Sequence, residues 1–214
     1  MITTIIITAT IMTISTRLLQ LASPTLPVGA YSYSQGLEAA VEAGVVKDAA
    51  TARSWIQDVL EFSVARFEAP LFLRSFDSGT FENALFLASR ETAELRAETV
   101  QMGYSLNRLL PELGVAALEL DEPSFPAVFA HAARAWGIGA ADALTAYLWA
   151  WLENQVMAAV KAVPLGQTAG QKMLSDLAAL IPNLLKSPPS GNFAPGLAIL
   201  SSRHETQYSR LFRS

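Results

Sequence analysis

Apolar side chains recur along most of this chain at steps of three and four residues, the spacing of one face of an α-helix. The clearest case is the segment 140–163, whose apolar face comprises Leu144, Tyr147, Leu148, Trp151, Leu152, Val156, Ala159, Val160 and Val163. Alternation with the two-residue period of a β-strand is nearly absent. The pattern therefore predicts an all-α protein with the broad face of 140–163 in its core.

Capping residues, glycines and prolines divide the rest of the chain into further helices. Asp48 is expected to cap a helix with apolar spacing through Phe62, and Pro70 is expected to kink or end that helix. The other expected helices span residues 17–22, 35–43, 81–90, 93–113 and 126–136. Short connections between such helices suit antiparallel neighbours. We therefore expect a single-domain helical bundle over residues 17–214.

The first 16 residues, MITTIIITATIMTIST, differ from the rest because they contain many isoleucines and threonines and no charge. They lack the basic flank and the small-residue cleavage site of a signal peptide. Their threonines also make them a poor membrane span. We expect residues 1–16 to be an atypical, poorly ordered leader.

Composition predicts more apolar surface than a monomer of this size hides. Charged residues make up 16% of the 214 residues, against about 25% in an average soluble domain, and mean hydropathy is +0.31. We expect this surface to contact other proteins and to form a symmetric homodimer. The net charge of −4 gives no electrostatic signature for binding nucleic acid or an anionic membrane. The absence of cysteine suits a reducing, cytoplasmic compartment.

Residue patterns typical of enzymes and metal sites are weak in this sequence. Neither histidine, His131 or His204, has a second strong metal ligand three or four residues away. No serine lies in a G-x-S-x-G elbow, and PLGQTAGQK (164–172) lacks the spacing of a phosphate-binding loop. We therefore expect no catalytic site, no cofactor and no metal site. The alternative is a small α-helical hydrolase or lyase using His204, Glu205 and Tyr208, which would have to converge in a pocket.

The segment 23–38, SPTLPVGAYSYSQGLE, interrupts the helical pattern. Its two prolines stiffen the backbone, and the glycine between them and the tyrosines permits a turn. Ser32 and Gln35 have the S-x-x-Q spacing of a capping box, which predicts that the next helix begins there. We expect Tyr31 and Tyr33 to project from this stiff corner.

The C-terminal stretch combines arginines with aromatic and aliphatic side chains. In a helix that continues through Leu211, the apolar stripe comprises Leu197, Leu200, His204 and Leu211, and the projecting polar side chains are Arg203, Gln207 and Arg210. One interpretation is an amphipathic last helix that packs on the bundle. The other is a docking segment for an acidic partner, because arginine and tyrosine are favoured interface anchors.

Four separated stretches, in this order, resemble one family. They are LLQLASPTLPVGAYSYSQGLE (18–38), MGYSLNRLLPELG (102–114), AYLWAWLENQVMAAVKAVPLGQTAGQKML (146–174) and RHETQYSRLFRS (203–214). From about residue 18 to residue 214 the chain resembles the urease accessory protein family UreF. The leader 1–16 is outside this resemblance.

The resemblance implies an all-α, homodimeric, cytoplasmic scaffold that is not an enzyme. It would bind the accessory protein UreD (also called UreH) and, through that complex, the GTPase UreG and the urease apoprotein. Nickel would then enter the urease active site with GTP hydrolysis. Its own contact with nickel would be indirect, because a direct carrier is hard to reconcile with two histidines and no cysteine. The residues expected to bind partners are Tyr31, Tyr33, Gln35, Glu38, Arg203, His204, Glu205, Gln207, Tyr208, Arg210, Leu211 and Phe212.

Overall fold

The computed structural model describes residues 15–78, 82–186, 188–189 and 191–214, so nearly all of the expected leader lies outside the described residues. The described residues form helices and no β-strand, which confirms the predicted all-α class. The α-helices are α1 (Thr16–Ala22), α2 (Leu37–Glu42), α3 (Ala49–Val59), α4 (Ala69–Ser78), α5 (Asn83–Ala88), α6 (Ala93–Leu109), α7 (Phe125–Ala135), α8 (Ala140–Ala162), α9 (Gln167–Ala178), α10 (Ile181–Leu184) and α11 (Pro195–His204). Helical turns of other types are η1 (Ala30–Ser32), the π-helical η2 (Leu60–Glu68) and η3 (Pro111–Leu113).

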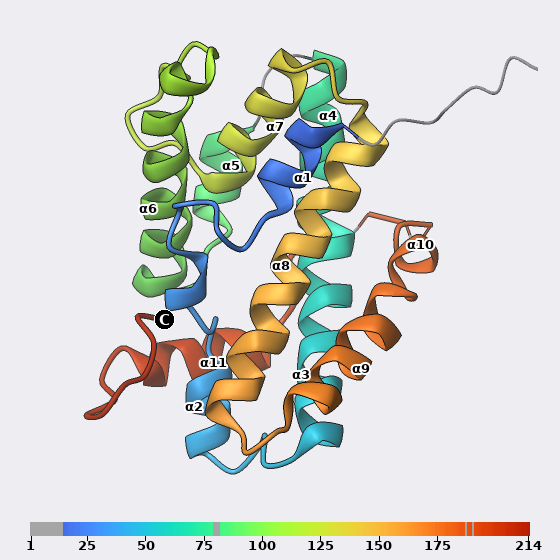
Figure 1. The fold of residues 1–214 in the computed structure, drawn as a ribbon. Coiled ribbons are helices and arrows are strands. Elements are labelled where there is room, and N and C mark those ends of the chain that lie inside the picture. Colours follow the sequence, from blue (N-terminus) through green and yellow to red (C-terminus); the bar gives the residue numbers. More distant parts are fainter. Residues whose placement is uncertain (1–14, 79–81, 187, 190) are drawn as a thin grey trace, which may run out of the picture.

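Helix α8 runs through the middle of the bundle (Figure 1). It packs against α1, α2 and α9 and also touches α3, α4 and α7. Leu148, Leu152 and Val156 are fully buried, as the apolar spacing predicts. On the opposite face Trp149 is 38% exposed and Lys161 is exposed, so this face meets solvent.

Three aromatic rings join helices at the core. Phe72 of α4 stacks on Tyr147 of α8 with ring centroids 5.2 Å apart, and Phe129 of α7 meets Tyr147 edge to face at 5.6 Å. Phe72 and Phe129 are fully buried and Tyr147 nearly so. Aromatic pairs in these geometries add attraction beyond the burial of their area. The cluster therefore positions α8 against α4 and α7.

The helix that follows Asp48 does not end at Pro70. The Asp48 carboxylate accepts the Thr51 amide at 2.8 Å and the Thr51 hydroxyl accepts the Asp48 amide, which confirms the predicted cap. From α3 the chain passes through η2 directly into α4, which contains Pro70. Proline cannot donate to the carbonyl four residues earlier and crowds it, so regular α-helical bonding is interrupted here. The interruption takes the form of wider π-helical turns before Pro70.

The remaining helix predictions are confirmed with changed boundaries. The expected helices 17–22, 93–113 and 126–136 are present as α1, α6 with η3, and α7. Of residues 35–43 only the part that forms α2 is helical. Of the expected helix 81–90, residue 81 lies outside the described residues, and the rest is helical only in α5. The stretch PLGQTAGQK enters helix α9 at Gln167.

Helix α6 and the chain entering α7 approach closely at Gly103. A Cβ atom built on Gly103 would lie 1.9 Å from the carbonyl oxygen of Pro123, which is far inside van der Waals contact. Two hydrogen bonds fix the chain before α7 in this position. The Phe125 amide donates to Thr99 Oγ1 of α6 at 3.1 Å, and the Ser124 amide donates to Asn83 Oδ1 of α5. Glycine is therefore required here by packing and not by backbone conformation.

Replacing Gly103 with alanine is expected to lower the free energy of unfolding by about 1–3 kcal/mol, because the new methyl group forces two backbones apart. This loss should outweigh the gain of alanine in helix propensity. Urea unfolding followed by circular dichroism measures it. Gly196→Ala is the matched control, since Gly196 is also helical and a Cβ atom there would meet only Trp55 at an ordinary 3.7 Å, and it should not destabilise the protein by more than about 0.5 kcal/mol. Equal stability of Gly103→Ala and the wild type would contradict the close approach.

Candidate functional site

Two segments that sequence analysis singled out lie next to each other. The N-terminal loop (residues 23–36) follows α1, and the C-terminal segment (residues 205–214) follows α11. Backbone hydrogen bonds join them directly, because the Arg213 amide donates to the Ser32 carbonyl at 2.7 Å and the Ser34 amide donates to the Ser214 carbonyl at 2.6 Å. The two segments meet beside α2 and α6 (Figure 1).

As far as residue 32, the backbone of the N-terminal loop turns as predicted. Gly29 has φ 79°, in the left-handed region, and provides the expected turn before η1. The capping box of Ser32 and Gln35 is wrong. Helix α2 begins at Leu37, with Gly36 as its N-cap at φ 75°. A Cβ atom on Gly36 would meet the Ser201 backbone of α11 at 3.2 Å, so packing against α11 displaces the start of the helix.

The two tyrosines of the N-terminal loop have opposite environments. Tyr31 is 66% exposed, and the Lys161 ammonium lies over its ring, 5.8 Å from the centroid. Tyr33 is only 5% exposed, so the prediction that it projects to solvent is wrong. Burial raises the pKa of the Tyr33 hydroxyl. Only Tyr31 is available to a partner.

The predicted continuation of the last helix through Leu211 is also wrong. Helix α11 ends at His204, and the chain then turns back along α2 and α6. Leu197, Leu200 and His204 are buried as the stripe predicts, but Leu211 is 73% exposed. The amides of the first residues after the helix still donate to its last carbonyls, for example Gln207 to His204, whereas amides further along the segment donate to a carboxylate of α2.

Glu38 of α2 is the main anchor of the C-terminal segment. Its oxygens accept the Leu211 amide at 2.7 Å and the Phe212 amide at 2.9 Å. Gln207 Nε2 also donates to Glu38 Oε1, at 3.4 Å. Glu38 is 7% exposed and Phe212 6% exposed, so this anchoring takes place in the interior. A buried carboxylate with several backbone donors forms charge-assisted hydrogen bonds, which are stronger than neutral ones.

Fully buried His204 lies between two carboxylates. Its Nδ1 atom is 2.7 Å from Glu94 Oε2, and its Nε2 atom is 3.3 Å from Glu38 Oε2. Both contacts are hydrogen bonds at once only when both ring nitrogens carry protons. Glu94 also accepts from Arg210 Nη1 at 2.6 Å, and the Glu94 amide donates to Glu205 Oε1 at 3.3 Å. Glu94 therefore ties α6 to both sides of the turn after α11.

Glu98 lies one helical turn after Glu94 and attaches the N-terminal loop and the C-terminal segment to α6. It accepts from Gln35 Nε2 at 2.7 Å and from Ser214 Oγ at 2.9 Å, so it holds both segments. Gln35 in turn accepts from Trp151 Nε1 of α8 at 2.9 Å. Burial, opposed by these hydrogen bonds, raises the pKa of Glu98 to about 7.

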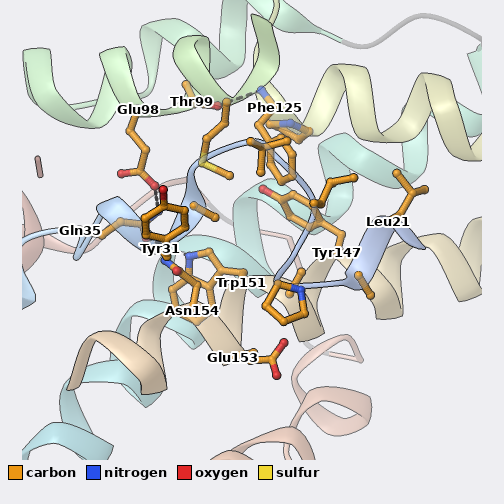
Figure 2. Close-up of a pocket in the computed structure, with 18 of the residues that line it drawn as sticks. Leu21, Tyr31, Gln35, Glu98, Thr99, Phe125, Tyr147, Trp151, Glu153 and Asn154 are labelled. Atoms are coloured by element: carbon orange, nitrogen blue, oxygen red, sulfur yellow. Dashed lines mark hydrogen bonds between the residues drawn. The ribbon is translucent and has the colours of Figure 1, made fainter. Parts of the chain in front are cut away.

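A cavity of about 230 Å³ lies beneath the N-terminal loop (Figure 2). Side chains of α6 and α8 line it together with the loop. Its walls are mainly apolar, with Leu26, Val28 and Phe125 among them, and Glu98 lines it as well. Figure 2 shows the Glu98 side chain extending from α6 towards Gln35. A cavity with apolar walls and a few convergent polar groups is typical of a ligand or side-chain binding site.

The geometry expected of a hydrolase or lyase is not present. His204 is fully buried, Glu205 is partly buried, and Tyr208 is fully exposed, and none of them lines the cavity. In the described part of the chain, no group of three or more histidine, aspartate or glutamate side chains is arranged to hold a metal ion. Among the described helices, none is long and apolar enough to cross a membrane.

Comparison with known proteins assigns the family. The UreF family model matches residues 46–178, more than half of the chain. The urease accessory protein UreF of Azoarcus sp. (strain BH72) is 61% identical, and the alignment covers 92% of this chain and 94% of the relative. This chain belongs to the UreF family.

Two further relatives are similar over the same share of this chain. The urease accessory protein UreF of Dechloromonas aromatica (strain RCB) is 53% identical over 92% of this chain and 96% of the relative. A bifunctional urease accessory protein UreEF of Bordetella bronchiseptica is 48% identical over 92% of this chain, which spans 51% of that protein. The resemblance seen in the four sequence stretches is thereby confirmed.

Several residues of the site were missed by sequence reasoning. Glu94 and Glu98 lie on α6 with the four-residue spacing of one helix face, but such spacing is common on solvated helices. Trp151 was assigned to the core and also donates a hydrogen bond to Gln35. Ser34, which donates to the Ser214 carbonyl through its hydroxyl at 2.5 Å, carried no signal. These roles depend on partners far away in the sequence.

Replacing Glu38 with glutamine should loosen the C-terminal segment, because an NH₂ group would face backbone amides that need an acceptor. We expect a loss of about 1–3 kcal/mol in the free energy of unfolding. Amide exchange at Leu211 and Phe212, followed by NMR, should become faster than in the wild type. Glu42→Gln is the matched control, since Glu42 is exposed on the same helix. Unchanged exchange in Glu38→Gln would show that Glu38 is not the anchor.

The free energy of unfolding should depend on pH through the titration of Glu98. Its folded-state pKa of about 7 lies above the ordinary 4.5, so folding favours the protonated carboxyl. This contribution is complete below about pH 4.5 and is lost as the pH rises through about 7. The stability of Glu98→Gln relative to wild type should therefore increase between about pH 5 and 8, by up to about 3 kcal/mol. Urea titrations across this range measure it. Exposed Glu112→Gln is the control. A pH-independent difference between Glu98→Gln and wild type would contradict the buried titration.

Proposed function

We propose that this UreF-family chain is a non-enzymatic, cytoplasmic scaffold in the maturation of urease. It binds the accessory protein UreD (UreH) and through that complex brings the GTPase UreG to the urease apoprotein. Nickel then enters the urease active site with GTP hydrolysis. The observation that carries the proposal is the C-terminal segment, which the chain anchors with its own carboxylates while leaving Tyr208 and Leu211 exposed.

The C-terminal segment is suited to docking because it is ordered before a partner arrives. Tyr208 is fully exposed and Leu211 is 73% exposed, although Phe212 beside them is buried. Burial of these two side chains in a complex would remove apolar surface from water. An anchored segment also loses less conformational entropy on binding than a free one. We assign UreD to this surface, and exposed Arg203 supplies a cation for an acidic partner group.

A second partner surface is proposed around Tyr31. Lys161 connects it with the C-terminal segment, because its ammonium lies over the rings of Tyr31 and Phe212 at 5.8 and 5.6 Å. We propose that this area contacts the second subunit or the complex with UreG. Four of the residues predicted to bind partners are buried: Tyr33, Glu38, His204 and Phe212. Their proposed role is instead to hold the N-terminal loop and the C-terminal segment in place.

The homodimer is also proposed. Large apolar side chains remain exposed on the described surface, for example Leu19, Val45 and Leu85. Symmetric two-fold contacts are the commonest way to cover such surface. Sedimentation of the purified chain measures the association. The bifunctional UreEF relative, which has two accessory proteins in its name, favours a role in assemblies of accessory proteins.

The double substitution Tyr208→Ala and Leu211→Ala should abolish docking without unfolding the chain. Both side chains are exposed, so the melting temperature should not change, whereas the affinity for UreD should fall at least tenfold, as is typical of interface anchors. Co-purification with UreD and UreG after co-expression measures binding. Leu120→Ala is the control, since Leu120 is exposed outside both segments. Undiminished co-purification would rule out this surface, and a wild type that binds neither protein would rule out the scaffold.

A further inference from the structure

The cavity beneath the N-terminal loop contains a carboxylate without a cation of its own. Glu98 is 5% exposed, and within the described residues it forms no ion pair. Its two hydrogen-bond donors, Gln35 Nε2 and Ser214 Oγ, are both neutral. An ionised carboxylate is costly to bury unless it is paired. A cation that enters this cavity would therefore be stabilised by Glu98.

The two cations that line the cavity are already engaged. Arg90 Nη1 lies 2.7 Å from Glu68 Oε1, and both side chains are buried. The Lys161 ammonium lies over aromatic rings at the surface. Glu153 lines the cavity as well, so three carboxylates face two cations. This balance favours a positively charged ligand over a neutral or negative one.

The backbone at Gln35 supports a binding role. Gln35 has φ 52°, a left-handed conformation that is uncommon for any residue other than glycine, asparagine or aspartate. Its side chain bridges Glu98 and Trp151 Nε1. Backbone strain of this kind persists only where surrounding contacts impose it, and it gathers at ligand sites. In this backbone conformation the Gln35 side-chain amide donates to Glu98 at the cavity wall.

The cavity has room for more than water and is reachable from solvent. Its volume of about 230 Å³ is far above the ~10–15 Å³ that a single water requires. Exposed Tyr31 and Lys161 are among its lining residues, so it opens at the surface. Apolar side chains such as Val28 and Met102 line it together with Glu98. Such walls suit a ligand that carries its charge on an apolar stem.

We propose that this cavity binds a guanidinium or ammonium group carried on a short apolar stem, with Glu98 as the pairing carboxylate. The stem lies against the apolar walls, and the cationic head donates hydrogen bonds to the Glu98 oxygens. Either a free amine or an arginine or lysine side chain of a partner protein supplies this chemistry. The site is distinct from the surface of Tyr208 and Leu211 that is proposed for UreD.

Two probes of the same shape test the charge preference. The purified full chain is titrated with n-butylguanidinium and, separately, with its neutral isostere n-butylurea, and binding is followed by NMR at the side chains of Gln35 and Trp151. We expect n-butylguanidinium to bind at least about tenfold more tightly, a ratio that corresponds to one charge-assisted pairing. Equal binding of the two probes, or shifts confined to other parts of the molecule, would overturn the proposal.

Glu98→Gln should remove the preference for the cation, whereas the exposed control Glu112→Gln should keep it. If Glu98→Gln does not fold, the pH dependence of the wild type gives the same information. The affinity for n-butylguanidinium should fall about tenfold from pH ~8 to ~6, because the carboxyl titrates near 7. A cation preference that persists in Glu98→Gln, or a pH-independent affinity, would overturn the proposal.

The charged and titratable groups that act on Glu98 are Glu68, Arg90, Tyr33 and Tyr147. Glu153 and Lys161 line the same cavity. Burial raises the pKa of both tyrosines, so neither titrates between pH ~6 and ~8. Burial also raises the pKa of Glu153, so the titration is repeated on Glu153→Gln. A pH dependence that persists in Glu153→Gln is assigned to Glu98.

Repeating the titration on the complex with UreD and UreG separates the two sources of the cation. If a side chain of a partner fills the cavity, n-butylguanidinium no longer binds to the complex. If the ligand is a free amine, the complex binds the probe as the chain alone does. Failure of the probe to bind the chain leaves co-purification with UreD unaffected, so this proposal and the scaffold are tested independently.

Discussion

The carboxylate of Glu38 joins the beginning and the end of the described chain. It accepts the amides of Leu211 and Phe212, residues more than 170 positions away, and faces the ring of His204. Without it, the buried Phe212 amide and the partly buried Leu211 amide would lose their acceptor, at a cost comparable to lost hydrogen bonds. The path of the C-terminal segment along α2 depends on this contact.

Two carboxylates of helix α6 also anchor the C-terminal segment. Glu94 and Glu98 are four residues apart, so both project from one face of the helix towards the C-terminal segment. Glu94 meets His204 and Arg210, and Glu98 meets Gln35 and Ser214. These buried polar contacts hold in place a segment that exposes Tyr208 and Leu211. The groups that order the segment are therefore not the ones that it exposes.

The sequence predicted which two segments form much of the candidate site, but not the direction in which their side chains point. Both segments were singled out from residue types, and Tyr31, Tyr208 and Leu211 are exposed as binding requires. Tyr33 has the same residue type as Tyr31 and the opposite environment, since one faces the interior and the other Lys161. Residue type predicts what a side chain is able to do, whereas its direction depends on the backbone of the loop.

The sequence alone determined the helices, because the apolar spacing of α8 and the cap at Asp48 act between residues a few positions apart. It also determined the family, through stretches spread over the chain. Only the tertiary structure decided where α2 begins and where α11 ends. The first depends on the fit of Gly36 against Ser201, and the path of the chain after α11 depends on the Leu211 and Phe212 amides that Glu38 accepts. These contacts join distant residues, and local periodicity contains no information about which of them will meet.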